Sequence, residues 1–202
     1  ELTSTQIGAL SAAQVGALSA TNISSLDATQ TAALTTTQVK GLASTQLRSL
    51  SATDISELTT TQVGALTASQ VGALTATAVS ALDATQTAAL STTQVKALTA
   101  VQLKGLSTTD IAEFADTQIG ALTPSQIGAL TATNLSALDA TQVAALSVTQ
   151  VKGLSVAQLK ALDVTDVAEL SSTQVGAMSA AQIGALSSTS LGSLDTTQLG
   201  AL

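Results

Sequence analysis

Paired carboxylates are the residues of this sequence best suited to chemistry. Asp54 and Glu57 lie three residues apart, a spacing that puts two side chains on one face of a helix. The same pair recurs as Asp110/Glu113 and Asp166/Glu169. Such carboxyls could share a proton-transfer step or bind a hard cation such as Ca²⁺. Calcium prefers six or more oxygen ligands, and no EF-hand or glycine-aspartate nonapeptide pattern supplies them here.

The two acids have different structural explanations. Asp54 falls in the first turn of an expected helix, where the helix dipole favours an acid, whereas Glu57 falls near the helix end, where an acid is disfavoured. We therefore expect Glu57 to form an ion pair with Lys40, Arg48 or their equivalents in a neighbouring turn. A solvated charge and a Ca²⁺ ligand are the alternatives.

Other catalytic chemistry lacks its residues. The chain has no His and no Cys, so a histidine base, a thiolate nucleophile and the commonest zinc ligands are missing. Ser and Thr are abundant, but they are required as helix caps. We predict that the chain is not an enzyme and that it has no catalytic, cofactor-binding or metal-binding residues.

Hydroxyl groups form the remaining candidate surface. Ser4, Thr5, Thr36 and Thr37 stand at positions that we expect to be exposed and regularly spaced. A face of this kind would suit a glycan, ice or a partner rod. The simpler interpretation is a soluble helix surface of low charge.

These residues belong to an eight-residue repeat. Leu recurs at every eighth position from Leu2 to Leu202, replaced only by Phe114 and Met178, and residues 2–201 form 25 octads. Counted from this Leu, position 2 is usually Ser, Thr or Asp, position 5 is usually Gln, and position 6 is Ile, Val or Leu except at Thr31 and Thr87. Ala43 and Ala115 are the two exceptions at position 2.

A longer period of seven octads lies above the octad. We expect one tandem array over residues 1–202, with modules at 2–57, 58–113 and 114–169 and a partial module at 170–202. Seven octads do not divide into two-helix hairpins. Either a turn of the solenoid is not two octads, or the long period only records a duplication. The array begins and ends without polar capping repeats, so we expect a fragment of a longer array.

The octad predicts one short helix. Ser, Thr or Asp followed three residues later by Gln is a capping box, which begins a helix. Pro124 lies directly after such a cap, at the first helical position, where proline is favoured. A single long helix is excluded because a strict period of eight gives it no apolar face. We therefore predict an all-α solenoid of short capped helices stacked into an elongated rod or superhelix, with a β-solenoid as the alternative.

Composition limits the partners. The net charge is −7 with six basic residues, which disfavours nucleic acid and anionic membrane surfaces. No apolar run is long enough to span a bilayer, so no membrane insertion is expected.

One octad buries too little to fold alone, so stability must come from stacked neighbours, with small residues at positions 7 and 8 allowing close approach. Uncapped ends would then self-associate end to end.

The run from Leu58 to Leu66, Leu-Thr-Thr-Thr-Gln-Val-Gly-Ala-Leu, resembles octapeptide-repeat regions of large secreted or cell-surface bacterial proteins. Those regions are often labelled adhesins or haem-utilisation proteins. The resemblance implies an extracellular or cell-surface location and a structural or adhesive role, as a spacer, stalk or fibre. A solenoid surface that binds a protein or glycan is the alternative. A haem role finds no support, because Met178 is the single conceivable axial ligand.

Overall fold

The computed structural model of the protein describes residues 2–202, which contain 25 α-helices, one in each octad. The helices are four to six residues long. This arrangement confirms the predicted all-α solenoid of short helices. The β-solenoid alternative is wrong, since no strand forms within residues 2–202. The chain divides into two compact units, Glu1–Leu106 and Ser107–Leu202.

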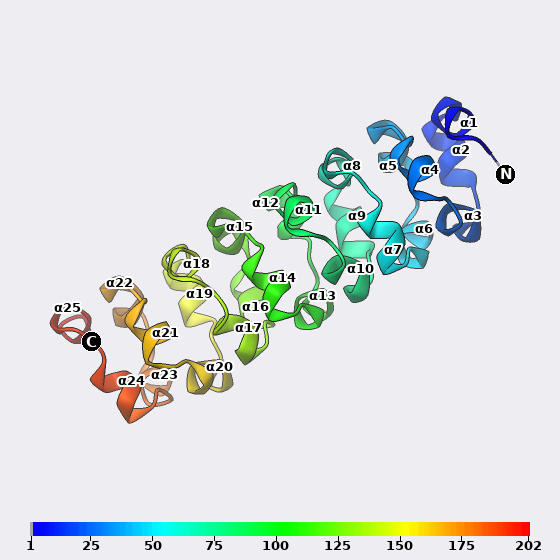
Figure 1. The fold of residues 1–202 in the computed structure, drawn as a ribbon. Coiled ribbons are helices and arrows are strands. Elements are labelled where there is room, and N and C mark those ends of the chain that lie inside the picture. The colour runs from blue at the N-terminus through cyan, green and yellow to red at the C-terminus, as the bar shows by residue number, and fades with distance from the viewer. Residues whose placement is uncertain (1) are drawn as a thin grey trace. The chain divides into compact units, whose positions relative to one another are not determined.

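The first unit contains thirteen helices (Figure 1). They are α1 (Ser4–Ala9), α2 (Ala12–Ala17), α3 (Ala20–Ser24), α4 (Ala28–Ala32), α5 (Thr36–Gly41), α6 (Ser44–Ser49), α7 (Ala52–Ser56), α8 (Thr60–Ala65), α9 (Ala68–Ala73), α10 (Ala76–Ser80), α11 (Ala84–Ala88), α12 (Thr92–Val95) and α13 (Ala100–Gly105).

The second unit contains twelve helices. They are α14 (Thr108–Ala112), α15 (Asp116–Ala121), α16 (Pro124–Ile127), α17 (Ala132–Leu135), α18 (Ala140–Ala144), α19 (Val148–Lys152), α20 (Val156–Ala161), α21 (Val164–Ala168), α22 (Ser172–Gly176), α23 (Ala180–Ile183), α24 (Ser188–Gly192) and α25 (Thr196–Leu199).

Helices begin at the predicted capping boxes. Before α8, the backbone N–H of Gln62 donates to Thr59 Oγ1 at 3.2 Å, and the N–H of Thr59 donates to Gln62 Oε1 at 2.8 Å. Pro124 is the first residue of α16, as predicted. Ala43 has no capping oxygen, yet its N–H still donates to Gln46 Oε1 at 2.7 Å, so half of the box is retained.

Helices end because the next cap needs an extended backbone. After α8, Leu66 has φ −55° and ψ 140°, and its N–H donates to the carbonyl of Val63. Thr67, the cap of α9, is extended as well, with φ −71° and ψ 157°. Two consecutive extended residues cannot continue a helix, so the chain turns sharply into the next one.

The core is made of position 1 and position 6 of each octad. Leu66 and Val63 are buried examples, and the two replacements of the repeating Leu, Phe114 and Met178, are buried in the same way. Thr31 and Thr87 occupy position 6 and are buried too. The apolar face that the octad predicted is therefore the face that the neighbours cover.

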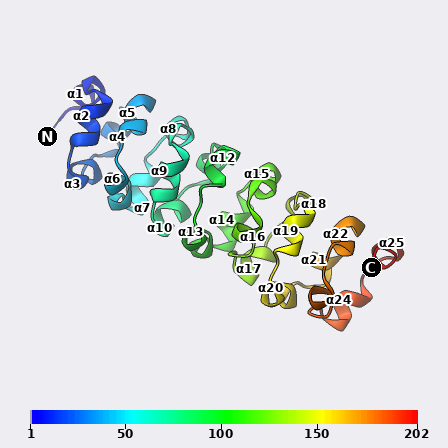
Figure 2. The same ribbon diagram turned by 180° about the vertical axis from the view of Figure 1, so that it is seen from behind.

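Helices three octads apart pack against each other. In the first unit α2 contacts α5, and α5 contacts α8 (Figure 1). In the second unit α16 contacts α19, and α19 contacts α22, a row visible from behind in Figure 2.

Small residues at the expected positions permit this close approach. A Cβ added to Gly72 would lie 2.9 Å from the carbonyl oxygen of Ala97, and one added to Gly41 would lie 2.9 Å from the Cβ of Ala12. Both distances are shorter than van der Waals contact, so these glycines are required by packing.

Candidate functional site

A buried glutamine joins most interior helices to the preceding turn. The side chain of Gln102, in α13, is 2% exposed, and its Oε1 accepts a hydrogen bond of 2.7 Å from the N–H of Thr99. Its Nε2 donates to the carbonyl oxygens of Val71 and Leu74, at the end of α9, each at 2.8 Å. One side chain therefore bonds to three backbone groups at the ends of short helices, of which the Val71 carbonyl also accepts from the N–H of Leu74.

This hydrogen bond recurs at constant sequence offsets. The glutamines reach carbonyls 28 and 31 residues earlier, as at Gln38, Gln62 and Gln94 in the first unit and Gln150 and Gln174 in the second. An offset of 28 residues is three and a half octads, so one turn holds between three and four helices. The 56-residue module is twice that offset and corresponds to two turns. A turn is therefore not a two-octad hairpin.

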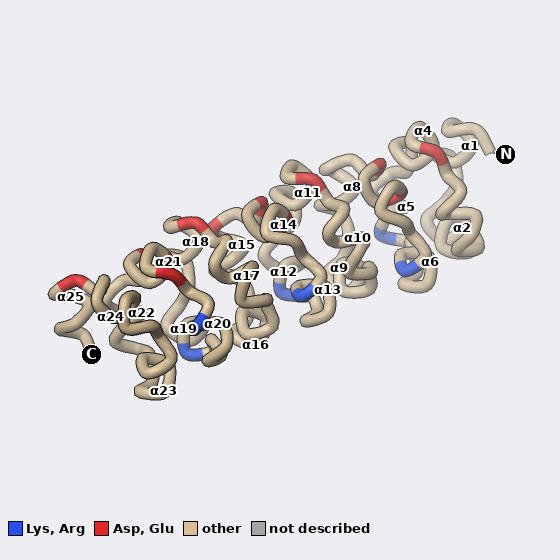
Figure 3. The backbone as a smooth tube through the Cα atoms, turned by 60° about the horizontal axis from the view of Figure 1, so that its bottom comes forward, with Lys and Arg blue, Asp and Glu red and all other residues tan. Residues whose placement is uncertain are grey.

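Because a module is two turns, equivalent residues within a unit return to the same side of the solenoid. Figure 3 shows the acidic and the basic residues of each unit on different sides. In the first unit Asp27 and Asp83 follow this spacing, as do Lys40 and Lys96. The long period thus matches two turns of the solenoid.

The first turn lacks the glutamine contact. Gln6 and Gln14 are exposed, and neither side-chain amide donates a hydrogen bond within residues 2–202. Leu2 is 42% exposed and Leu10 is only partly covered, whereas the repeating apolar residue is buried from Leu34 to Leu194. This turn therefore presents amide donors together with uncovered leucines.

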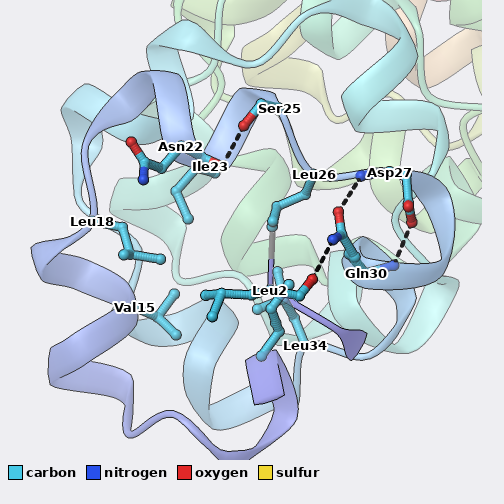
Figure 4. Close-up of a pocket in the computed structure, with 11 residues that line it drawn as sticks. Leu2, Val15, Leu18, Asn22, Ile23, Ser25, Leu26, Asp27, Gln30 and Leu34 are labelled. Atoms are coloured by element: carbon cyan, nitrogen blue, oxygen red, sulfur yellow. Dashed lines mark hydrogen bonds between the residues drawn. The ribbon is translucent and has the colours of Figure 1, made fainter. Parts of the chain in front are cut away.

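Leu2, Leu18 and Leu26 are among the residues that line a cavity of about 500 Å³ at this turn. Figure 4 shows the side chains of Val15, Leu18 and Leu26 facing it, together with Leu2, whose carbonyl oxygen accepts a 2.6 Å hydrogen bond from Gln30 Nε2. The walls are mostly aliphatic, and Asp27 and Gln30 at the rim form the capping box of α4. The cavity is the open end of the solenoid core and has no constellation of catalytic groups.

The last turn presents the opposite chemistry. Gln198 is the last glutamine to reach back, donating to the carbonyl of Leu170 at 2.5 Å. The corresponding carbonyls of α22 and α23, at Met178 and Leu186, receive no Gln amide within residues 2–202. Leu199, at position 6, is 51% exposed, whereas the position 6 residues of interior turns are buried.

The predicted ion pair of Glu57 does not form. One carboxylate oxygen of Glu57 is buried without a hydrogen-bond partner, and the side chain pairs with neither Lys40 nor Arg48 among residues 2–202. The reason is the turn length. Glu57 follows α7, which packs against α10, whereas α5 and α6, which carry the two cations, pack against α8 and α9.

Asp166, one of the aspartates at position 5, replaces the glutamine contact with a reversed one. Asp166 Oδ2 accepts a 2.6 Å hydrogen bond from Ser136 Oγ in the preceding turn and one of 2.8 Å from the N–H of Asp163. Burial raises the pKa of the nearby Glu169, and the negative charges of Asp166, Asp139 and Asp163 raise it further. Asp139, Asp163, Asp166 and Glu169 therefore lie close enough for their negative charges to repel one another.

Two acidic caps are stabilised as carboxylates. The backbone N–H of Gln86 and the hydroxyl of Thr85 lower the pKa of Asp83. The hydroxyl of Thr141 and the backbone N–H of Gln142 lower the pKa of Asp139. Both shifts follow from helix capping.

The other candidate groups stay dispersed. Thr5 and Thr37 are exposed, and Ser4 and Thr36 are partly exposed, in helices α1 and α5. Met178, the conceivable haem ligand, is part of the core. The part of the chain that the structure describes contains no group of three or more acidic, His or Cys residues arranged for a metal ion. None of its helices has the length and apolarity needed to cross a bilayer.

The donor role of the glutamine was missed by the capping-box interpretation. A signal was present in the sequence, because Glu serves a capping box as well as Gln does, yet position 5 never holds Glu. The residues that do replace Gln recur every 56 residues. They are Asn22, Ala78, Asn134 and Ser190 in one phase, and Asp54, Asp110 and Asp166 in another.

Comparison with known proteins supports the repeat. Residues 39–76 and 101–132 match the model of the ALTTAQ repeat. Both segments lie inside the octad array, so the chain is similar to this repeat family and contains a tandem-repeat region. A comparison with curated proteins finds no match.

Proposed function

We propose that the chain is a non-enzymatic structural segment, a rod- or filament-forming spacer within a secreted or cell-surface bacterial protein. The location and the stalk or fibre role come from the repeat regions that the sequence resembles. The similarity to the ALTTAQ repeat supports a repeat-containing structural segment.

The observation that carries the proposal is the constant contact between turns. The offsets of 28 and 31 residues are the same at Gln38, near the start, and at Gln182, near the end. Each octad that carries the Gln therefore uses the same donor, acceptors and apolar surface as the others. Such nearest-neighbour energetics suits a spacer whose length follows the number of repeats.

The use of the polar residues also favours a structural role. The hydroxyls and carboxylates at position 2 cap helices, and the buried glutamines join turns, as Thr99 and Gln102 illustrate. Few polar groups with shifted pKa values remain for chemistry, and those that do are caps or crowded acids.

Changing the number of modules tests the proposal. One variant lacks residues 58–113, and a second contains that segment twice, so both keep the octad and the two-turn phase. We expect the maximum dimension from small-angle X-ray scattering to fall and rise by equal increments, with unchanged helicity per residue. A dimension that does not follow module number would contradict the spacer role. Specific binding of the isolated chain on a glycan array would favour the alternative, a binding module.

A further inference from the structure

Charge is divided between two sides of the turns. In the first unit the exposed acids Asp27 and Asp83 are 56 residues apart, and so are the exposed bases Lys40 and Lys96. Because 56 residues are two turns, each pair returns to the same place around the solenoid. Lys40 follows Asp27 by 13 residues, close to half of a turn, so the two rows lie on different sides (Figure 3).

These rows define an acidic side and a basic side in each unit. The acidic side carries Asp27 and Asp83 in the first unit and Asp139 and Asp195 in the second. The basic side carries Lys40, Arg48, Lys96 and Lys104 in the first unit and Lys152 and Lys160 in the second. All six basic residues of the chain therefore belong to the basic side, and all six are exposed.

The carboxylates of the acidic side use only one of their two oxygens. Asp83 Oδ1 accepts a 2.8 Å hydrogen bond from the N–H of Gln86 and a 2.7 Å bond from Thr85 Oγ1. Its other oxygen, Oδ2, has no hydrogen-bond partner within residues 2–202, and Asp139 is bonded through Oδ1 alone in the same way. The cap therefore holds each carboxylate in one orientation while Oδ2 remains available to a cation.

The basic side offers the complementary groups. Lys40 and Arg48 lie in the consecutive helices α5 and α6, and Lys152 and Lys160 repeat the pair in α19 and α20. The side chains of these four residues form no hydrogen bond or ion pair within residues 2–202. Each turn geometry thus keeps cations and carboxylates too far apart to pair inside one unit.

We propose that the basic side of one copy of this chain docks onto the acidic side of a second copy, so that neighbouring solenoids lie side by side. The exposed Lys and Arg side chains then bond to the Oδ2 atoms of the Asp row. Each copy keeps one further side of each charge, so the contact is heterologous and propagates into a sheet of solenoids. The inference rests on the proposed structural role and names the partner in it.

A second copy is the partner that fits because both rows repeat with the same period. When one cation pair meets an Asp, the next pair, two turns further on, meets the next Asp. A single exposed ion pair contributes little, but pairs that form together on one rigid array add their effects. A polyanion would use the basic side alone, and a divalent cation would use the acidic side alone.

Neutralising the acidic side is the first test. The variant replaces the Asp row by Ser, as Asp27→Ser, Asp83→Ser, Asp139→Ser and Asp195→Ser. Serine keeps the helix cap, as Ser91 does before α12, and circular dichroism should show unchanged helicity. Sedimentation velocity across a dilution series at about 0.1 M salt should show concentration-dependent assembly of the unchanged chain. The variant should bind about tenfold more weakly or worse.

The sign of this effect separates docking from general repulsion. The four substitutions bring the net charge from −7 to −3. If acidic copies merely repelled one another, the variant would assemble more strongly than the unchanged chain, whereas docking through the Asp row predicts weaker assembly. In about 1 M salt the screening length falls to about 3 Å, so assembly of the unchanged chain should be lost.

Mixing tests whether the two sides meet each other. A second variant carries Lys40→Gln, Arg48→Gln, Lys96→Gln, Lys104→Gln, Lys152→Gln and Lys160→Gln, which leaves only the acidic side charged. Each variant alone should stay monomeric in the concentration range in which the unchanged chain assembles. An equimolar mixture contains one intact side of each kind, so it should form heterodimers that do not grow further.

These results also separate the docking from the spacer role. A chain that stays a 19.8 kDa monomer at about 0.1 M salt would overturn the docking. So would an Asp variant that assembles as well as the unchanged chain, a mixture that stays monomeric, or assembly that persists in about 1 M salt. The module-length experiment can be done in about 1 M salt, where copies are apart, so the spacer role fails only if length does not follow module number.

Discussion

The first turn and an interior turn are made of the same residue types and differ in what covers them. Leu2 is 42% exposed, whereas Leu74, at the same octad position, is 5% exposed. Gln6 is exposed and its amide has no acceptor in residues 2–202, whereas Gln70 is buried and its amide donates to Val39 and Leu42 at 2.9 Å.

The comparison shows that octad position alone does not determine burial. A Leu or a Gln contributes to stability only when the turn before it is present, and a position 6 residue only when the turn after it is present. This is the nearest-neighbour behaviour of solenoids, in which interfaces between repeats provide most of the stability. The same substitution should therefore have different effects in the two regions.

The largest difference is expected for the repeating leucine. Leu74→Ala removes a buried side chain and leaves a cavity, so it should lower the free energy of unfolding by about 2–5 kcal/mol. Leu2→Ala should lower it by less than about 1 kcal/mol, because much of that side chain is already in water. Urea denaturation followed by circular dichroism measures both. Equal losses would show that the first turn is covered in solution.

Removing the amide should have the next largest effect. Gln102→Leu leaves the N–H of Thr99 and two inter-turn carbonyls without this partner, so we expect a loss of about 1–3 kcal/mol. Gln14→Leu removes no inter-turn bond and should change stability by less than about 0.5 kcal/mol in dilute solution. The same denaturation measurement applies. A mild effect at Gln102 would mean that water replaces the amide in interior turns.

Replacing a glycine at position 7 by alanine should change the stability in opposite directions in the two regions. The Cβ of Gly72→Ala would clash with the carbonyl oxygen of Ala97, so a net loss of about 1 kcal/mol is expected. At Gly192, in the last turn, an added Cβ meets no atom within 4 Å. Gly192→Ala should stabilise by about 0.4–1 kcal/mol, because alanine restricts the unfolded chain. Thermal unfolding of both variants checks the signs, and a loss at Gly192 would contradict the open environment.

The smallest effect concerns charge within an interior turn. Folding raises the pKa of Glu169, so its ionisation destabilises the folded state as pH rises through the interval between the unfolded and folded pKa values. Glu169→Gln should therefore raise the melting temperature at about pH 7 and leave it unchanged at about pH 3, where the carboxyl is protonated in both states.

The control for this change is Asp83, whose pKa shift on folding has the opposite direction. Folding lowers the pKa of Asp83, so its charge stabilises the fold above the unfolded pKa, and that stabilisation is lost as pH falls through the folded value. Asp83→Asn keeps a good cap and should give no gain at about pH 7. A gain from both variants would indicate a general effect of net charge.

Local features of the fold were predictable because they depend on residues within one octad. The cap, the position of Pro124 and the apolar pair of Leu and Val act over fewer than eight residues. The ion pair expected for Glu57 was wrong because it depended on which helices are neighbours. That neighbourhood follows from the turn length, which no single octad contains.

The sequence by itself determined where each helix begins, which side chains are apolar and that no octad is stable alone. Those properties follow from backbone capping and hydrophobicity, which act locally. Only the tertiary structure decided that a turn holds between three and four helices, so that Gln102 meets Val71 and Leu74 and a 56-residue module spans two turns. The physical reason is that turn length results from how closely small residues let successive helices pack, and that distance is set by contacts between octads far apart in the chain.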